Sequence, residues 1–188
     1  TFVRRAFLDA TGTQPTIEQV QAFLKSDAAN KREALIDELL GLTGDPDRDI
    51  HNDNYAGYWT LKWSDLIRNT SNGGGQELAM WSMHNWMKEA FRTNRPFDEV
   101  VAELVTAKGS VYSSGPANYF RIFRNSTELT EATAQLFLGV RLECAKCHHH
   151  PFEKYTQGDY YAFSAFFSRV GTKRSEEFGL FGGESVVI

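Results

Sequence analysis

Apolar residues recur every three or four positions along most of this chain, the spacing that places them on one face of an α-helix. Stretches rich in glycine, proline and small polar residues separate these segments. Few segments alternate apolar and polar residues as a half-buried strand does. The pattern therefore predicts an all-α fold of about seven to nine short helices. The predicted helices cover residues 2–10, 31–42, 54–69, 76–92 and 126–140, and three more begin near Thr16, Phe97 and Thr156.

The starts of three predicted helices carry capping signatures. A Thr or Asn side chain accepts N–H bonds from the first helical turn, and a Glu, Gln or Asp three residues later completes the cap. The pairs with this spacing are Thr16 with Gln19, Asn125 with Glu128, and Thr156 with Asp159. In the helix that begins near Thr16, the apolar residues expected to face the core are Ile17, Val20, Phe23 and Leu24.

The length of 188 residues is enough for one domain with a hydrophobic core. We assign residues 1–171 to a single helical domain. Residues 172–188 are predicted to form a tail or the start of a following segment, because 182–188 resembles a strand that is just beginning. Since a helical pattern begins at once after Thr1, without a Met or a leader, we expect the chain to be a piece of a longer protein.

Composition narrows the classes of function. Hydrophobic residues make up 41% of the chain and aromatic residues 13%, which gives a bulky interior suited to a flat porphyrin and equally to an ordinary aromatic core. The net charge of −4 argues against a nucleic-acid-binding surface. No apolar run is long enough to cross a membrane, so we predict no transmembrane segment in this chain.

The most informative chemical pattern is the segment 144–148, Cys-Ala-Lys-Cys-His, which holds both cysteines of the chain. C-x-x-C-H is the attachment pattern of c-type haem, in which two thiols add across the two vinyl groups and the adjacent imidazole binds the iron. If the segment is helical, Cys144, Cys147 and His148 share one face. The preceding predicted helix leads directly to Cys144. The sequence thus predicts one covalent haem c, with His148 as the proximal iron ligand.

Three other uses of the two cysteines remain open. A zinc site would need two further ligands, but the chain has no second C-x-x-C and no H-x-x-x-H, and Pro151 pushes His150 out of helical geometry. A thiol–disulfide redox pair would normally follow a strand in a βαβ unit, whereas the residues before Cys144 indicate a helix. The third alternative is two inert thiols.

A sixth ligand for the haem would come from the helix predicted over 76–92. The residues on one of its faces are Met80, Met83, His84, Met87 and Phe91. Met and His are the usual sixth ligands of haem c, so Met80, Met83 and His84 are candidates for the distal side. The competing interpretation is core packing, since Met fills irregular gaps. His51, in a polar loop, is a weaker candidate, and an open sixth position is a further alternative.

A group of motifs spread over nearly the whole chain occurs together. They are Phe2–Asp9 with Thr11-Gly12 and Pro15-Thr16, Trp63–Arg68, Asn94–Asp98, Phe137–Phe152, Tyr160–Phe163 and Ala165–Phe167. Together they resemble a domain of unknown function from Planctomycetes and related bacteria, which occurs in large secreted proteins alongside planctomycete cytochrome c domains. The resemblance implies an exported bacterial protein, periplasmic or extracellular. It also implies that His150 either donates a hydrogen bond to a haem propionate or is a structural residue that holds its loop.

Three functions follow from these observations. The first is a c-type cytochrome domain whose helices surround one covalent haem c and which exchanges single electrons with a redox partner protein or a neighbouring cytochrome domain. The second is a haem enzyme or sensor with an open sixth position, similar to a peroxidase. The third is a non-haem interaction module in which the cysteines hold zinc or form a disulfide. Electron transfer is preferred over enzymatic activity.

Overall fold

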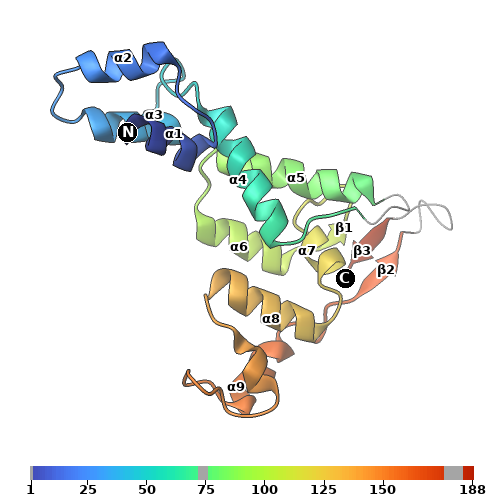
Figure 1. Cartoon of the computed structure of the whole chain (residues 1–188). Helices are drawn as coiled ribbons and strands as arrows, with labels where there is room; N and C mark the ends of the chain where they lie inside the picture. The colour runs from blue at the N-terminus through green and yellow to red at the C-terminus, as the bar shows by residue number, and fades with distance from the viewer. Residues whose placement is uncertain (1, 72–75, 176–183) are drawn as a thin grey trace. The chain divides into compact units, whose positions relative to one another are not determined.

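The computed structural model describes residues 2–71, 76–175 and 184–188 and shows a mostly helical protein (Figure 1). Nine α-helices lie within these described residues, at the upper end of the predicted number. The chain divides into two compact units. Unit 1 comprises Thr1–Trp63 and Met87–Pro96, and unit 2 comprises Ser64–Trp86 and Phe97–Ile188.

Unit 1 is built from short amphipathic helices. Its elements are α1 (Phe2–Thr11), α2 (Ile17–Lys25), α3 (Lys31–Leu40), most of α4 (Asn52–Leu66) and the end of α5 (Glu77–Arg92). Val3, Phe7 and Leu39 form its buried cluster, and Val20 and Phe23 of α2 pack against it. The other two residues of the apolar stripe predicted for α2, Ile17 and Leu24, are exposed to solvent.

The prediction that Ile17 and Leu24 are buried was wrong, since they are 71% and 69% exposed. The reason is that α2 meets the cluster through the edge defined by Val20 and Phe23. Ile17 and Leu24 lie toward the other side of the same apolar stripe. The periodicity identified the helix but overestimated the width of its buried face.

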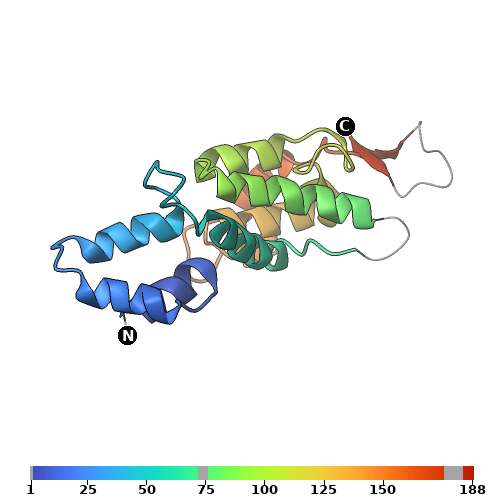
Figure 2. The same ribbon diagram turned by 90° about the horizontal axis from the view of Figure 1, so that it is seen from above.

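Unit 2 contains most of the buried aromatic residues. Its helices are the end of α4, the start of α5, α6 (Phe97–Thr106), α7 (Asn118–Ile122), α8 (Ser126–Phe137) and α9 (Gln157–Ala165), with a 3₁₀-helix, η1, at Leu142–Lys146. Helices α5 and α6 lie side by side in both ribbon views (Figures 1 and 2), and Trp86 Nε1 of α5 donates to Glu103 Oε1 of α6 at 3.1 Å. Met83 and Tyr119 are fully buried in this unit.

A small sheet corrects the prediction of an all-α fold. β1 (Gly109–Ser110), β2 (Thr172–Arg174) and β3 (Ser185–Val187) form an antiparallel sheet in the order β1-β3-β2. Val187 pairs with Gly109 on one side and with Thr172 on the other. Residues 172–174 and 185–187 thus pair within unit 2. Strands of two or three residues are too short to show an alternating pattern in the sequence.

All three capping predictions are confirmed. Thr16 and Thr156 form complete capping boxes with Gln19 and Asp159, and Asn125 Oδ1 accepts the Glu128 N–H at 2.9 Å. The predicted helix ends were less accurate, because α8 ends at Phe137 instead of residue 140. Gly139 follows with a φ of 69°, in the left-handed region that glycine favours, so the helix does not lead directly to Cys144. The predicted loop over 69–75 lies partly outside the described residues.

Candidate functional site

The C-x-x-C-H segment forms a single tight turn on the surface of unit 2. Leu142 and Ala145 of η1 are buried, with exposed fractions of 5% and 0%, and pack with Ala134 of α8 and Tyr160 of α9. In a 3₁₀-helix residues three apart lie above one another. Burial of Leu142 and Ala145 therefore leaves Cys144 and Cys147 on the solvent side, where both are exposed and carry free thiols.

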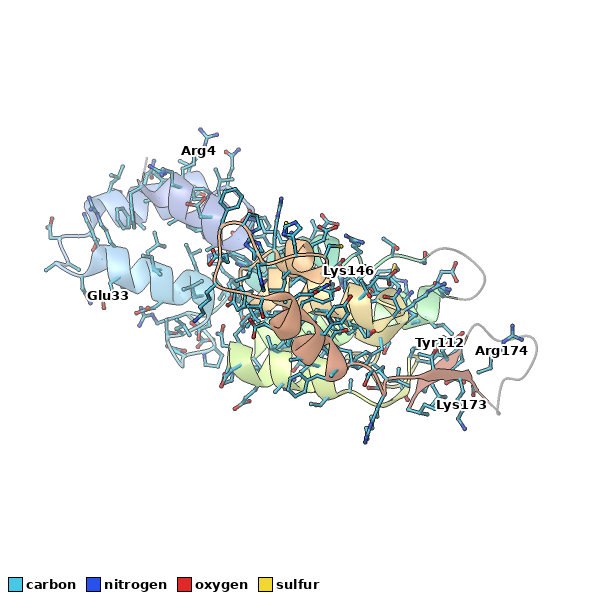
Figure 3. All side chains as sticks on the ribbon, turned by 90° about the horizontal axis from the view of Figure 1, so that it is seen from below. Arg4, Glu33, Tyr112, Lys146, Lys173 and Arg174 are labelled. Atoms are coloured by element: carbon cyan, nitrogen blue, oxygen red, sulfur yellow. The ribbon has the colours of Figure 1, made fainter. Side chains whose placement is uncertain are left out.

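Backbone hydrogen bonds hold this turn together and attach it to α9. The carbonyl oxygen of Cys144 accepts the N–H groups of both Cys147 and His148, each at 3.4 Å. The carbonyl oxygen of Lys146 accepts from Gln157 Nε2 at 3.0 Å and from the Tyr161 hydroxyl at 3.4 Å. Lys146 is labelled in Figure 3, which views the molecule from the side that carries α9. The turn is thus positioned by packing on one side and by hydrogen bonds at its end.

The imidazole of His148 is oriented by its neighbour in the chain. Its Nδ1 lies 2.7 Å from the carbonyl oxygen of His149. A carbonyl oxygen only accepts, so this contact assigns the proton to Nδ1. In the neutral ring Nε2 is then the nitrogen with the free lone pair. Metal-binding histidines commonly donate their other ring N–H to a backbone carbonyl in this manner.

His150 has a different role. Its Nδ1 accepts the N–H groups of Phe152 and Glu153 at 3.2 and 3.0 Å, and its Nε2 donates to the carbonyl oxygen of Arg141 at 3.0 Å. Both ring nitrogens are therefore used to fasten the loop after the motif to the segment before it. Of the two roles that the resemblance implied, these contacts match the structural one.

The predicted distal residues are not placed beside the motif. Met83 is fully buried, Met80 and His84 are half-buried, and the His84 ring lies 5.2 Å from that of Trp81. All three belong to α5, whereas η1 packs on α8 and α9. In Figure 1 the start of α5 and the region of α9 lie at opposite ends of unit 2. His51 belongs to unit 1, where its ring contacts Phe7 at 5.0 Å and Gln19.

Large apolar side chains remain exposed on the elements around the turn. Phe152 is 90% exposed, Phe166 79%, Leu138 61% and Tyr161 54%. Leu138 also lines a small cavity of about 220 Å³, together with residues of α8, η1, α9 and the connections between them. Large exposed apolar side chains are typical of a binding surface where they form a continuous patch. The sequence showed these residues, but their exposure follows only from the way α9 and the loop fold.

The described residues contain no preformed cluster of metal-ligating side chains. Within 2–71, 76–175 and 184–188, no three His, Cys, Asp or Glu side chains lie together as a ready metal-ion site. A zinc ion at Cys144 and Cys147 would thus require ligands that the described fold does not bring there. Among the described helices, none combines the length and the hydropathy that a membrane crossing requires.

The fold and the site define a mostly helical domain that presents a C-x-x-C-H turn on its surface. The chain belongs to the family PSCyt2, described as a protein of unknown function (DUF1549), whose model matches residues 1–172. This match supports the resemblance to a planctomycete-type domain of unknown function. Neither the curated proteins nor the solved structures gave a match.

Proposed function

We propose that the turn at Cys144–His148 is the attachment site of one haem c, and that the chain is a c-type cytochrome domain that transfers single electrons. In this proposal the thiols of Cys144 and Cys147 add across the two vinyl groups, each forming one thioether bond. His148 Nε2 is the proximal ligand of the iron. When bound, the haem supplies an iron that alternates between the ferric and ferrous states.

The observation that carries the proposal is the orientation of His148. Its Nδ1 donates to the carbonyl oxygen of His149 at 2.7 Å, which leaves Nε2 as the ligating nitrogen. The two thiols are free, exposed and three residues apart in a turn whose opposite face is buried. Exposed thiols and one oriented imidazole in five residues are the donor set that haem c requires.

The test is covalent haem in protein produced together with a cytochrome c maturation system. The pyridine haemochrome spectrum after acid–acetone extraction should report one retained haem per chain. Cys144→Ala combined with Cys147→Ala should abolish the retained haem, and His148→Ala should alter the ferric and ferrous spectra. His149→Ala is the matched control, because its side chain is exposed and only its backbone carbonyl contacts His148. Retained haem in the double Cys variant would contradict the proposal.

A second candidate is a haem with an open sixth position, which would bind peroxide or a diatomic gas. The observation that favours it is the composition of the helices that pack on η1, since neither α8 nor α9 contains a Met or a His. The visible absorption spectrum of the resting ferric protein distinguishes an electron-transfer haem from a haem with an open sixth position. A low-spin, six-coordinate ferric haem supports electron transfer with a ligand supplied from elsewhere, and a high-spin ferric haem that binds cyanide supports the open position.

The cofactor also bears on location and partners. Haem c is attached outside the cytoplasm, so the proposal places this chain in the periplasm or outside the cell, as part of a larger exported protein.

The exposed apolar groups Phe152, Tyr161 and Phe166 provide a surface for a redox partner or a neighbouring cytochrome domain. Oxidation of the reduced domain by a purified cytochrome c, followed in a stopped-flow instrument, would test electron transfer directly.

A further inference from the structure

Three arginines line a small polar pocket in unit 2. Its volume is about 180 Å³, and its lining residues are Arg68, Thr70, Gln76, Arg121, Ile122 and Arg124. Arg68 follows α4, Arg121 lies in α7, and Arg124 lies in the connection between α7 and α8. The pocket thus gathers positive charge from chain segments that are distant in sequence.

Arg121 is held rigidly in this pocket. Its Nε donates to Asn118 Oδ1 at 2.6 Å, and one terminal nitrogen donates to Gln76 Oε1 at 3.1 Å and to the Thr70 carbonyl oxygen at 3.3 Å. The other terminal nitrogen donates to Asn69 Oδ1 at 3.3 Å. All of these acceptors are neutral. They fix the position of the guanidinium without neutralising its charge.

No carboxylate of the described residues forms an ion pair with the three arginines. The ion pairs found within the described part of the chain are Arg48 with Glu38 and Arg92 with Glu89. Glu128 accepts the backbone N–H of Arg124 at 2.9 Å but forms no ion pair with its guanidinium. Burial and the charge of Arg124 lower the pKa of Arg121, which is the direction expected for a cation whose charge is not compensated. A partly buried positive charge of this kind is costly until an anion approaches it.

Within the part of the chain that the structure describes, the guanidinium groups of Arg68 and Arg124 donate no hydrogen bond. The guanidinium carbon of Arg68 lies 6.0 Å from the centre of the Phe123 ring, a cation–π contact that involves no hydrogen bond. The hydrogen bond at Arg124 is made by the backbone, so its five side-chain N–H donors remain. A terminal N–H of Arg121 is also left after its contacts to Asn69, Thr70 and Gln76.

We infer that this pocket binds a small tetrahedral oxyanion, the class that includes inorganic phosphate and sulfate. Guanidinium groups present N–H donors in a fork that matches the oxygens of such anions. Donors arriving from three chain segments suit an ion that carries oxygens in every direction, better than a planar carboxylate does. The pocket is of a size for a single small ion, and the site is separate from the C-x-x-C-H turn.

The test is calorimetric titration of the purified chain with inorganic phosphate, sulfate and acetate at pH 7.5, with the ionic strength held constant by chloride. Phosphate and sulfate should bind saturably with one ion per chain. Acetate should bind at least about tenfold more weakly, because it lacks the additional oxygens and charge. Equal binding of acetate, or no saturable binding of phosphate and sulfate, would overturn the inference.

Variants locate the binding in the pocket. Arg68→Gln combined with Arg124→Gln should raise the Kd for phosphate by about tenfold or more, since each lost charge-assisted hydrogen bond is worth at least that factor. These changes leave the hydrogen bonds of Arg121 in place, so folding should be retained. Arg174→Gln, in β2, is the matched control, because it removes one exposed charge of unit 2 outside the pocket (Figure 3). An unchanged Kd in the double variant would reject the site.

Discussion

At the scale of single residues, two histidines two positions apart have different tasks. His148 uses one ring nitrogen to contact the His149 carbonyl, whereas His150 uses both, one as a donor and one as an acceptor. The sequence identified the motif and both histidines. It did not assign their roles, because a tautomer depends on the hydrogen-bond partners that the folded backbone supplies.

Replacing His150 by Ala should loosen the loop that follows the motif. The imidazole accepts the N–H groups of Phe152 and Glu153, so their amide hydrogens should exchange with solvent at least about tenfold faster in the variant. Hydrogen exchange followed by NMR measures this. His149→Ala should leave both rates unchanged, and equal acceleration in the two variants would contradict the structural role of His150.

Burial of Tyr119 makes the free energy of unfolding depend on pH in the alkaline range. The Tyr119 hydroxyl is buried and bonds to Thr133 Oγ1 at 2.8 Å, and burial raises its pKa from 10.0 to about 12. Because the folded-state pKa lies above the unfolded value, the stabilisation is complete below pH 10 and is lost as the pH rises through 12.

Between these pH values the free energy of unfolding should fall by up to roughly 1.4 kcal/mol per pH unit through Tyr119. Urea denaturation at several pH values measures the slope. Tyr119→Phe should be less stable at neutral pH because Thr133 loses its partner, but its stability should fall less steeply above pH 10. A slope equal to that of the unmodified chain would contradict this explanation.

At the scale of elements, the periodic pattern and the capping residues predicted the helices well. Thr16, Asn125 and Thr156 each begin a helix as expected, since a cap depends only on residues within one turn. The errors concern features that depend on distant contacts. The buried face of α2 is narrower than its apolar stripe, and the strands β1 and β3 form only because residues far apart in sequence pair with each other.

Gly115 allows two elements of unit 2 to approach closely. A Cβ at this position would lie 2.4 Å from Trp86 Cβ and 2.7 Å from the Ser82 carbonyl oxygen. Gly115→Ala should therefore lower the free energy of unfolding by about 1–3 kcal/mol, the usual cost of overpacking. Urea denaturation followed by circular dichroism tests this.

The control for this prediction is Gly158→Ala in α9 of the same unit. A Cβ there would meet only Thr156 Oγ1, at an ordinary contact distance of 3.5 Å. Alanine also favours the helix, so stability should stay the same or rise by up to about 1 kcal/mol. Similar losses in both variants would indicate that the close approach at Gly115 is not the cause.

At the scale of the whole molecule, the sequence indicated the C-x-x-C-H segment but not the organisation of the elements around it. The chain forms two compact units, and the C-x-x-C-H turn and the sheet that includes residues 172–174 both belong to unit 2. The exposed aromatic residues around the turn and the arginine pocket have no periodic signature. Both features form where segments that are distant in the sequence come together in the folded state, as the segments that carry Arg68 and Arg124 do.

The central claim is that two thiols and one imidazole of this turn hold a haem. The most direct measurement is the intact mass of the denatured chain, taken with its visible spectrum, after production with a cytochrome c maturation system. The account predicts a mass increased by one haem and no thiol that reacts with an alkylating reagent. A colourless chain with the mass of the polypeptide alone, and with Cys144 and Cys147 both free to be alkylated, would contradict it.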